Sequence, residues 1–423
     1  PVRTGQAALC LLIAALLLAL LARDAYAFAF GLLLAALIAA AVTVDRVAML
    51  APVLAGIMPP LLLYALIRIM GEDIAGPLAP AWGWILAAIG GTAALTGAWR
   101  TARDARLARI AGAHAMSMTG MALLSLGLAI FSAPQLAATA LDAALLFVFV
   151  NALTAPLLGL GGLILLEATG TDSLDWLGGL ARGMPQFAML MLAGAFALSA
   201  LPLGPGFAPI FMLLRSAIAI ASAAAAPGRE GSALIGLVLV FGLAAAQFAV
   251  SGFAAVRLFG LGFLGRPRSL RAAAAEEVER PLRLALGVLA GLGLILGLLP
   301  GVVLDLIGPA IGEAQPAAQL LGGWPMEAPL GPAVYAPLVL LGLMAIIALS
   351  LLQFSRRIAP GAAQEVAHWQ DGFDKPPPWL PFGDPATQIT GTGFSAPLRL
   401  AAPPWLGRFL GRFLGRFLVR PWK

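Results

Sequence analysis

Residues 136–166 read LAATALDAALLFVFVNALTAPLLGLGGLILL, an almost wholly apolar run that indicates the fold class. One helix needs only about 20 residues to cross the hydrocarbon core of a membrane, so this run is longer than a single crossing requires. Near its middle, Asn151 and Thr154 precede Pro156, and proline removes a backbone hydrogen-bond donor. The pattern predicts a helix that is broken at membrane depth, a feature that transporters place at ion sites.

The composition extends this conclusion to the whole chain of 423 residues. Hydrophobic residues make up 61% and charged residues 11% of the sequence, and the mean hydropathy is +0.95. Soluble domains carry about 25% charged residues. The sequence therefore predicts an all-α, polytopic membrane helix bundle. One cysteine and two histidines exclude a disulfide framework and argue against a metal, haem or iron–sulfur site, so no cofactor is expected.

About eleven apolar segments have the length of a membrane span. The first two follow each other at once, which favours a retained helix over a cleaved signal peptide. The spans form a predicted transmembrane bundle over residues 1–354, and residues 355–423 form an extramembrane tail. LPLGPGF at residues 201–207 is expected to break the chain between two spans. The predicted spans are residues 6–22, 27–44, 47–70, 82–99, 111–132, 136–166, 187–203, 208–226, 233–262, 284–307 and 333–354.

The tail ends in a repeated basic pattern. Residues 405–420 read WLGRFLGRFLGRFLVR, in which an arginine recurs every fourth residue. Such spacing places Arg408, Arg412, Arg416 and Arg420 on one side of a helix, with phenylalanine and leucine on the other. This amphipathic pattern is typical of helices that bind anionic lipids. The alternative is an acidic groove of a partner subunit, and nucleic acid is not expected because no folded basic domain is present.

The distribution of arginine leaves the membrane orientation open. The two most basic loops span residues 100–109 and 266–283. Basic loops normally share the cytoplasmic side. An odd number of predicted spans separates these two, so the rule and the span count disagree.

Polar and ionisable residues inside spans are the candidates for an ion pathway, because charge at bilayer depth is costly. Asp142 fits a proton or cation stop, or an interface-level carboxylate that Arg215 could pair with. His114 fits either a titrating group or a hydrogen-bonded packing residue. Arg257 lies near the end of its span and could instead extend to the headgroups. The predicted ion-pathway residues are His114, Asp142, Asn151, Thr154, Gln247 and Arg257. The small-residue runs indicate helix packing.

Several short motifs give the chain a family resemblance. They include LGGLARGMP at 177–185, ALSALPLGPGF at 197–207 and RLFGLGFLGRPRS at 257–269. HWQDGF at 368–373 and TGTGFSAPLR at 390–399 follow in the tail. In this order the motifs resemble the antiporter-like membrane subunits of complex I, Mrp antiporters and group 4 hydrogenases. The large antiporter-like subunit of hydrogenase-4 and formate hydrogenlyase is the most similar, over about residues 45–400.

The resemblance implies a proton relay that this sequence has largely lost. In the family, a lysine on a central helix and lysines or histidines on the broken helices carry protons along the membrane midplane. The central lysine position falls at Pro60 here, and an acidic position falls at Ser117. The broken-helix positions fall at Phe147, Asn151 and Ala155, and the late lysine is Arg257; His114 alone is retained. Both lysines of the chain, Lys375 and Lys423, lie in the tail.

Three functions follow from these observations. The first is a membrane-arm subunit of a multisubunit proton- or cation-translocating redox complex, mainly structural and not itself catalytic. Its expected partners are other membrane subunits and anionic lipids, and its expected location is the bacterial inner membrane. The first alternative is a reduced but active proton or cation conduit. The second alternative is a stand-alone secondary transporter.

Overall fold

The computed structural model describes residues 80–131, 134–224, 230–307, 326–327, 334–358, 382 and 388–393. Three predicted spans, at 6–22, 27–44 and 47–70, lie outside this part of the chain. The same is true of Pro60 and of the predicted amphipathic helix at 405–420.

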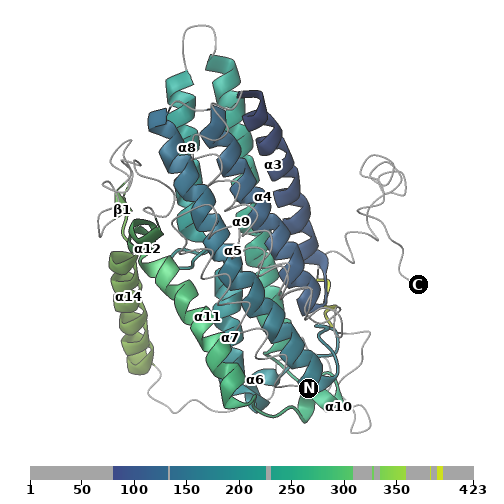
Figure 1. The fold of residues 1–423 in the computed structure, drawn as a ribbon. Helices are drawn as coiled ribbons and strands as arrows, with labels where there is room; N and C mark the ends of the chain where they lie inside the picture. Colours follow the sequence, from purple (N-terminus) through teal and green to yellow (C-terminus); the bar gives the residue numbers. More distant parts are fainter. Residues whose placement is uncertain are drawn as a thin grey trace, which may run out of the picture.

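The described residues form long helices that lie roughly side by side (Figure 1). Five of these helices are long and apolar enough to cross a membrane, which confirms the predicted all-α membrane bundle. A short antiparallel pair of strands places Met326 opposite Tyr335. The elements are α3 (Pro80–Arg103), α4 (Leu107–Phe131), α5 (Pro134–Thr169), α6 (Leu180–Gly183), α7 (Pro185–Ser199), α8 (Phe207–Ala224), α9 (Glu230–Gly262), α10 (Leu270–Ala273), α11 (Arg280–Leu298), α12 (Pro300–Ile307), β1 (Met326–Glu327), β2 (Val334–Tyr335) and α14 (Pro337–Ile358).

The predicted break at Pro156 is wrong. Helix α5 continues through this proline for 36 residues, about 54 Å at the rise of an α-helix. One proline removes a single intrahelical hydrogen bond, and neighbouring helices can satisfy the freed backbone group. Burial of α5 among α4, α7, α8 and α11 provides such neighbours.

The break predicted at 201–207 is confirmed. Helix α7 ends at Ser199, α8 begins at Phe207, and Ala200 and Leu203 between them adopt positive φ angles of 52° and 74°. The phenolic oxygen of Tyr335, on β2, accepts a hydrogen bond of 3.0 Å from the Leu203 amide. A chain segment far along the sequence thus satisfies a backbone donor that the break exposes.

Helices α7 and α8 together run once from one end of the bundle to the other, whereas the sequence predicted two separate spans at 187–203 and 208–226. The start of α7 lies beside Glu277, whose carboxylate accepts hydrogen bonds from the Gln186 and Phe187 amides. Helix α8 leads into α9 at the opposite end (Figure 1). An even number of crossings therefore separates the two basic loops, and both loops lie at one end of the bundle.

Hydrogen bonds between loops hold together the end of the bundle that carries the two basic loops, which we call the basic end. The Leu107 amide donates to the Asp172 carbonyl at 3.0 Å, which links the α3–α4 turn to the segment after α5. The Gly178 amide donates to the Gly262 carbonyl at 3.1 Å, which adds the end of α9. The arginines of this end are Arg100, Arg103, Arg106, Arg109, Arg182, Arg266, Arg268, Arg271, Arg280 and Arg283.

Helices α3 and α4 approach each other closely through glycines. A Cβ atom added to Gly97 would lie 2.5 Å from the Ser117 nitrogen, and one added to Gly120 would lie 2.3 Å from the Ala94 nitrogen. Small residues allow this backbone contact, which membrane helices use in place of a hydrophobic driving force. The predicted packing role of the small residues is confirmed for this pair of helices.

Candidate functional site

A chain of neutral polar side chains crosses the interior between α3, α4 and α9. Ser117 lies 2.7 Å from Gln247 Oε1 and 2.9 Å from the Ala94 carbonyl, and Gln247 Nε2 lies 3.0 Å from the Ser251 hydroxyl. All three side chains are buried. We call Ser117, Gln247 and Ser251 the Gln247 chain.

The orientation of the Gln247 amide decides whether every group in this chain has a partner. Ser117 has one hydroxyl proton but faces two acceptors. If the amide is turned by 180°, Gln247 donates to Ser117, accepts from Ser251, and leaves Ser117 to donate to the Ala94 carbonyl. In that arrangement the Gln247 chain is satisfied without any charge, as a structural tie between helices requires.

Asn151 forms a second tie, between α5 and α4. Its Nδ2 donates to the Ala115 carbonyl at 3.3 Å and to the Thr119 hydroxyl at 3.2 Å. Its Oδ1 is buried without a partner among the described residues. The amide nitrogen of Asn151 therefore has hydrogen-bond partners, whereas its amide oxygen has none among the described residues.

His114 is buried, and neither of its ring nitrogens has a hydrogen-bond partner within the described part of the chain. The hydrogen-bonded packing histidine considered above is therefore not what the structure contains. Each buried polar group left unpaired costs about 1–3 kcal/mol. A His114 side chain that served packing alone would therefore destabilise the fold.

Asp142 and Arg215 do not satisfy each other. Asp142 Oδ2 and Arg215 Nη2 are both buried, and neither atom has a hydrogen-bond partner among the described residues. Asp142 lies in the first third of α5, and Arg215 lies near the middle of α8. The pairing considered from the sequence is not formed through these atoms.

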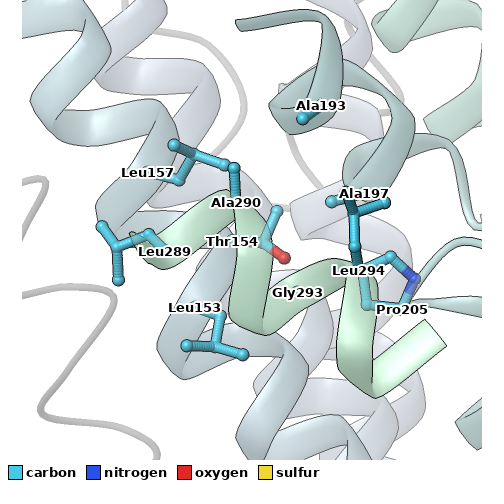
Figure 2. Close-up of a pocket in the computed structure, with 10 residues that line it drawn as sticks. All are labelled: Leu153, Thr154, Leu157, Ala193, Ala197, Pro205, Leu289, Ala290, Gly293 and Leu294. Carbon is cyan, nitrogen blue, oxygen red and sulfur yellow. The ribbon is translucent and has the colours of Figure 1, made fainter. Parts of the chain in front are cut away.

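Thr154 lies apart from the Gln247 chain and faces a pocket. Figure 2 shows its hydroxyl directed into the space between α11 and Pro205 of the α7–α8 break. The other residues that line the pocket are apolar. No member of the Gln247 chain lines this pocket. The remaining lining residues are Leu153, Leu157, Ala193, Ala197, Pro205, Leu289, Ala290, Gly293 and Leu294.

Arg257 is bound to backbone rather than to other candidates. The side chain is 5% exposed, and it donates to the Thr101 carbonyl at 2.7 Å and to the Gly391 carbonyl at 2.5 Å. The Phe253 ring lies 5.9 Å from its guanidinium carbon. Arg257 therefore joins α9 to α3 and to a short segment of the tail.

The structure thus brings only some predicted residues together. Gln247 and Asn151 both contact α4, whereas Thr154 and Arg257 have separate surroundings. The sequence did not identify Thr119 or Gly391, because their partners lie far away along the chain and no local pattern marks them. Among the described residues, no group of three histidine, cysteine or acidic side chains could hold a metal ion.

Three relatives align with between 58% and 81% of this chain. Formate hydrogenlyase subunit 3 of Escherichia coli is 26% identical over 349 residues, which is 81% of this chain and 53% of that protein. Hydrogenase-4 component B of Escherichia coli is 27% identical over 254 residues, 58% of this chain and 36% of that protein. An uncharacterized protein of Mycobacterium tuberculosis is 33% identical over 261 residues, 61% of this chain and 40% of that protein. The chain thus spans about half or less of the length of these relatives.

A solved structure shows the same fold. A chain of the membrane-bound sulfane sulfur reductase, an archaeal respiratory membrane complex, matches with a TM-score of 0.60 and 19% identity. The match covers 85% of this chain and 57% of that chain. No protein-family model matches the sequence. The resemblance to antiporter-like membrane subunits is confirmed, because the chain is a relative of hydrogenase-4 component B and formate hydrogenlyase subunit 3.

Proposed function

We propose that the chain is a membrane-arm subunit of a multisubunit proton- or cation-translocating redox complex and that its role there is mainly structural. Two relatives are named as parts of hydrogenase-4 and formate hydrogenlyase, and the similar solved chain comes from a respiratory membrane complex. The partners are other membrane subunits and anionic lipids, and the location is the bacterial inner membrane.

The Gln247 chain is the observation that carries the structural role. A relay needs groups that gain and lose protons, but hydroxyl and amide groups do not titrate in the accessible pH range. Arg257, at the late lysine position of the family, holds its proton in proteins. The spans of this sequence contain no lysine at all. Within the Gln247 chain, Ser117 stands where the family resemblance implies an acidic residue, so a neutral hydrogen bond takes the place of an ionisable group there.

Purification from gentle detergent, followed by mass spectrometry, tests membership of a complex. Stoichiometric recovery of redox subunits and other antiporter-like chains is the expected result. Recovery of the chain alone, or as a homo-oligomer, would instead favour an independent transporter and contradict the proposal.

Substitution of His114 and Asp142 tests the structural role within that complex. His114→Ala and Asp142→Asn should each leave assembly intact and change coupled transport by less than about twofold, since no relay depends on them. Transport is measured by dye quenching in proteoliposomes, and assembly is measured by the stoichiometry of the purified complex. Loss of coupled transport in a fully assembled complex would contradict the structural role.

A reduced conduit is the second candidate, because of the unpaired polar atoms. His114, the Oδ1 atom of Asn151 and the Thr154 hydroxyl are buried without partners among the described residues. Such groups can bind water that passes protons. Asn151→Leu separates the two functions: a conduit should lose about tenfold or more of its transport rate, as when a proton-transfer group is removed. Phe149→Leu, two residues away on the same helix, is the control.

A further inference from the structure

The buried end of α9 binds a short segment of the tail. Gly391 is itself buried, and its carbonyl accepts the 2.5 Å hydrogen bond from Arg257. Phe253 and Arg257 lie one turn apart on α9 and both face this segment, because a Cβ atom on Gly393 would lie 2.9 Å from Phe253 and 3.2 Å from Arg257. We call residues 388–393 the tail latch.

Charged side chains hold the latch by its backbone on both sides. Arg268 donates to the Ile389 carbonyl at 2.8 Å, while the Gly391 amide donates to Asp175 Oδ1 at 2.5 Å. Hydrogen bonds with one charged partner are about twice as strong as neutral ones. Burial lowers the pKa of Arg268, and the nearby Asp175 carboxylate opposes part of this shift. Two arginines and one aspartate thus bind the backbone of Ile389 and Gly391 in the latch.

The latch also fits its site by shape. A Cβ atom on Gly391 would lie 3.0 Å from Asp175 Oδ1 and 3.0 Å from the Ala105 Cβ, so a larger side chain would have to push these neighbours aside. The Gly393 amide donates to the Thr390 carbonyl at 2.8 Å, which closes a turn, and the φ angle of Gly393 is +55°. Glycine adopts such an angle at a lower cost than a residue with a Cβ atom does. The sequence TGTG therefore matches this site in both conformation and size.

The position of the latch relates it to the Gln247 chain. Arg257 follows Ser251 by six residues on the same helix, about 9 Å along the axis. The contacts at Ala105, Asp175 and Phe253 place the latch across the α3–α4 turn, the segment after α5, and α9. We propose that the tail latch closes the basic end of the bundle over Arg257, so that water does not reach the Gln247 chain from that side. This inference does not depend on membership of a redox complex.

Accessibility of a cysteine at position 251 tests the closure. The probe is Ser251→Cys in a chain from which Cys10→Ser has removed the native cysteine. The protein is reconstituted in lipid nanodiscs, so that the reagent has access to both faces of the membrane. A small, charged methanethiosulfonate reports how fast water reaches the probe. Labelling should be slow in this parent and about tenfold or more faster with Gly391→Leu, because the larger side chain expels the latch from its site.

Matched variants separate release of the latch from general damage. Gly260→Leu, also on α9, adds the same side chain where a Cβ meets no atom within 4 Å, and it should leave labelling slow. Asp175→Ala should speed labelling, whereas Asp175→Asn should not, since its amide oxygen still accepts from Gly391. Gel filtration and the helical circular-dichroism signal verify that each variant is folded. Equal labelling rates in the parent and in folded Gly391→Leu would overturn the proposal, as would rapid labelling of the parent.

Discussion

At the scale of single residues, neutral polar side chains connect buried faces of neighbouring helices. Gln247 reaches both Ser117 and Ser251, and so connects α9 to α4 by side chains alone. Hydrogen bonds between membrane helices contribute modestly, about 0.6 kcal/mol on average in one well-measured case. The contribution of Gln247 to stability is therefore measurable but small.

Gln247→Leu should lower the free energy of unfolding by about 1 kcal/mol, because it removes a bridging amide and leaves the Ser251 hydroxyl without a partner. Unfolding in mixed micelles with increasing sodium dodecyl sulfate measures the change. Val256→Leu, at a position 74% exposed on the same helix, should change stability little. An unchanged or higher stability of Gln247→Leu would mean that the amide serves water or an ion instead of packing.

At the scale of helices, the close contact between α3 and α4 is the clearest packing feature. Gly120→Leu should weaken this pair by about 2 kcal/mol or more, because the new side chain meets the Ala94 and Gly90 backbones, which cannot move aside independently. The same unfolding assay measures the loss. Gly112→Leu is the control on the same helix, since a Cβ there has no atom within 4 Å. Equal effects of the two variants would contradict close packing at Gly120.

The helices also show what local sequence can and cannot predict. Composition and the length of the apolar segments were sufficient to predict the membrane bundle. Two prolines and two glycines were sufficient to predict the break at 201–207. A lone Pro156 was not, because the tertiary surroundings of α5 decide whether one missing hydrogen bond ends a helix.

The candidate site was predictable only in part for a similar reason. A polar residue in an apolar run, such as Gln247 or Asn151, is visible in the sequence. Its partner depends on which helices become neighbours. The Arg257–Gly391 contact joins residues 134 positions apart, so only the structure identifies Arg257 as a residue that binds the tail.

At the scale of the whole molecule, the uneven distribution of the arginines indicates how the protein is oriented in the membrane. From residue 110 to residue 181 the sequence contains no lysine or arginine, and this stretch includes the α4–α5 turn at the far end. The basic loops before α4 and after α9 meet at the opposite end, together with the tail latch. Short loops rich in lysine and arginine remain on the cytoplasmic side. With α7 and α8 counted as one crossing, this rule now gives a single answer.

We therefore predict that the basic end and the tail latch face the cytoplasm. In a chain with Cys10→Ser, a membrane-impermeant maleimide applied to intact cells should label Ser222→Cys, which is exposed in the last turn of α8 at the far end. Ala274→Cys, exposed beside α10 at the basic end, should react only after the cells are permeabilised. Labelling of Ala274→Cys in intact cells would reverse the orientation. Labelling of both sites in intact cells would contradict the prediction, because it would mean that α9, the one long helix between the two sites, does not cross the membrane.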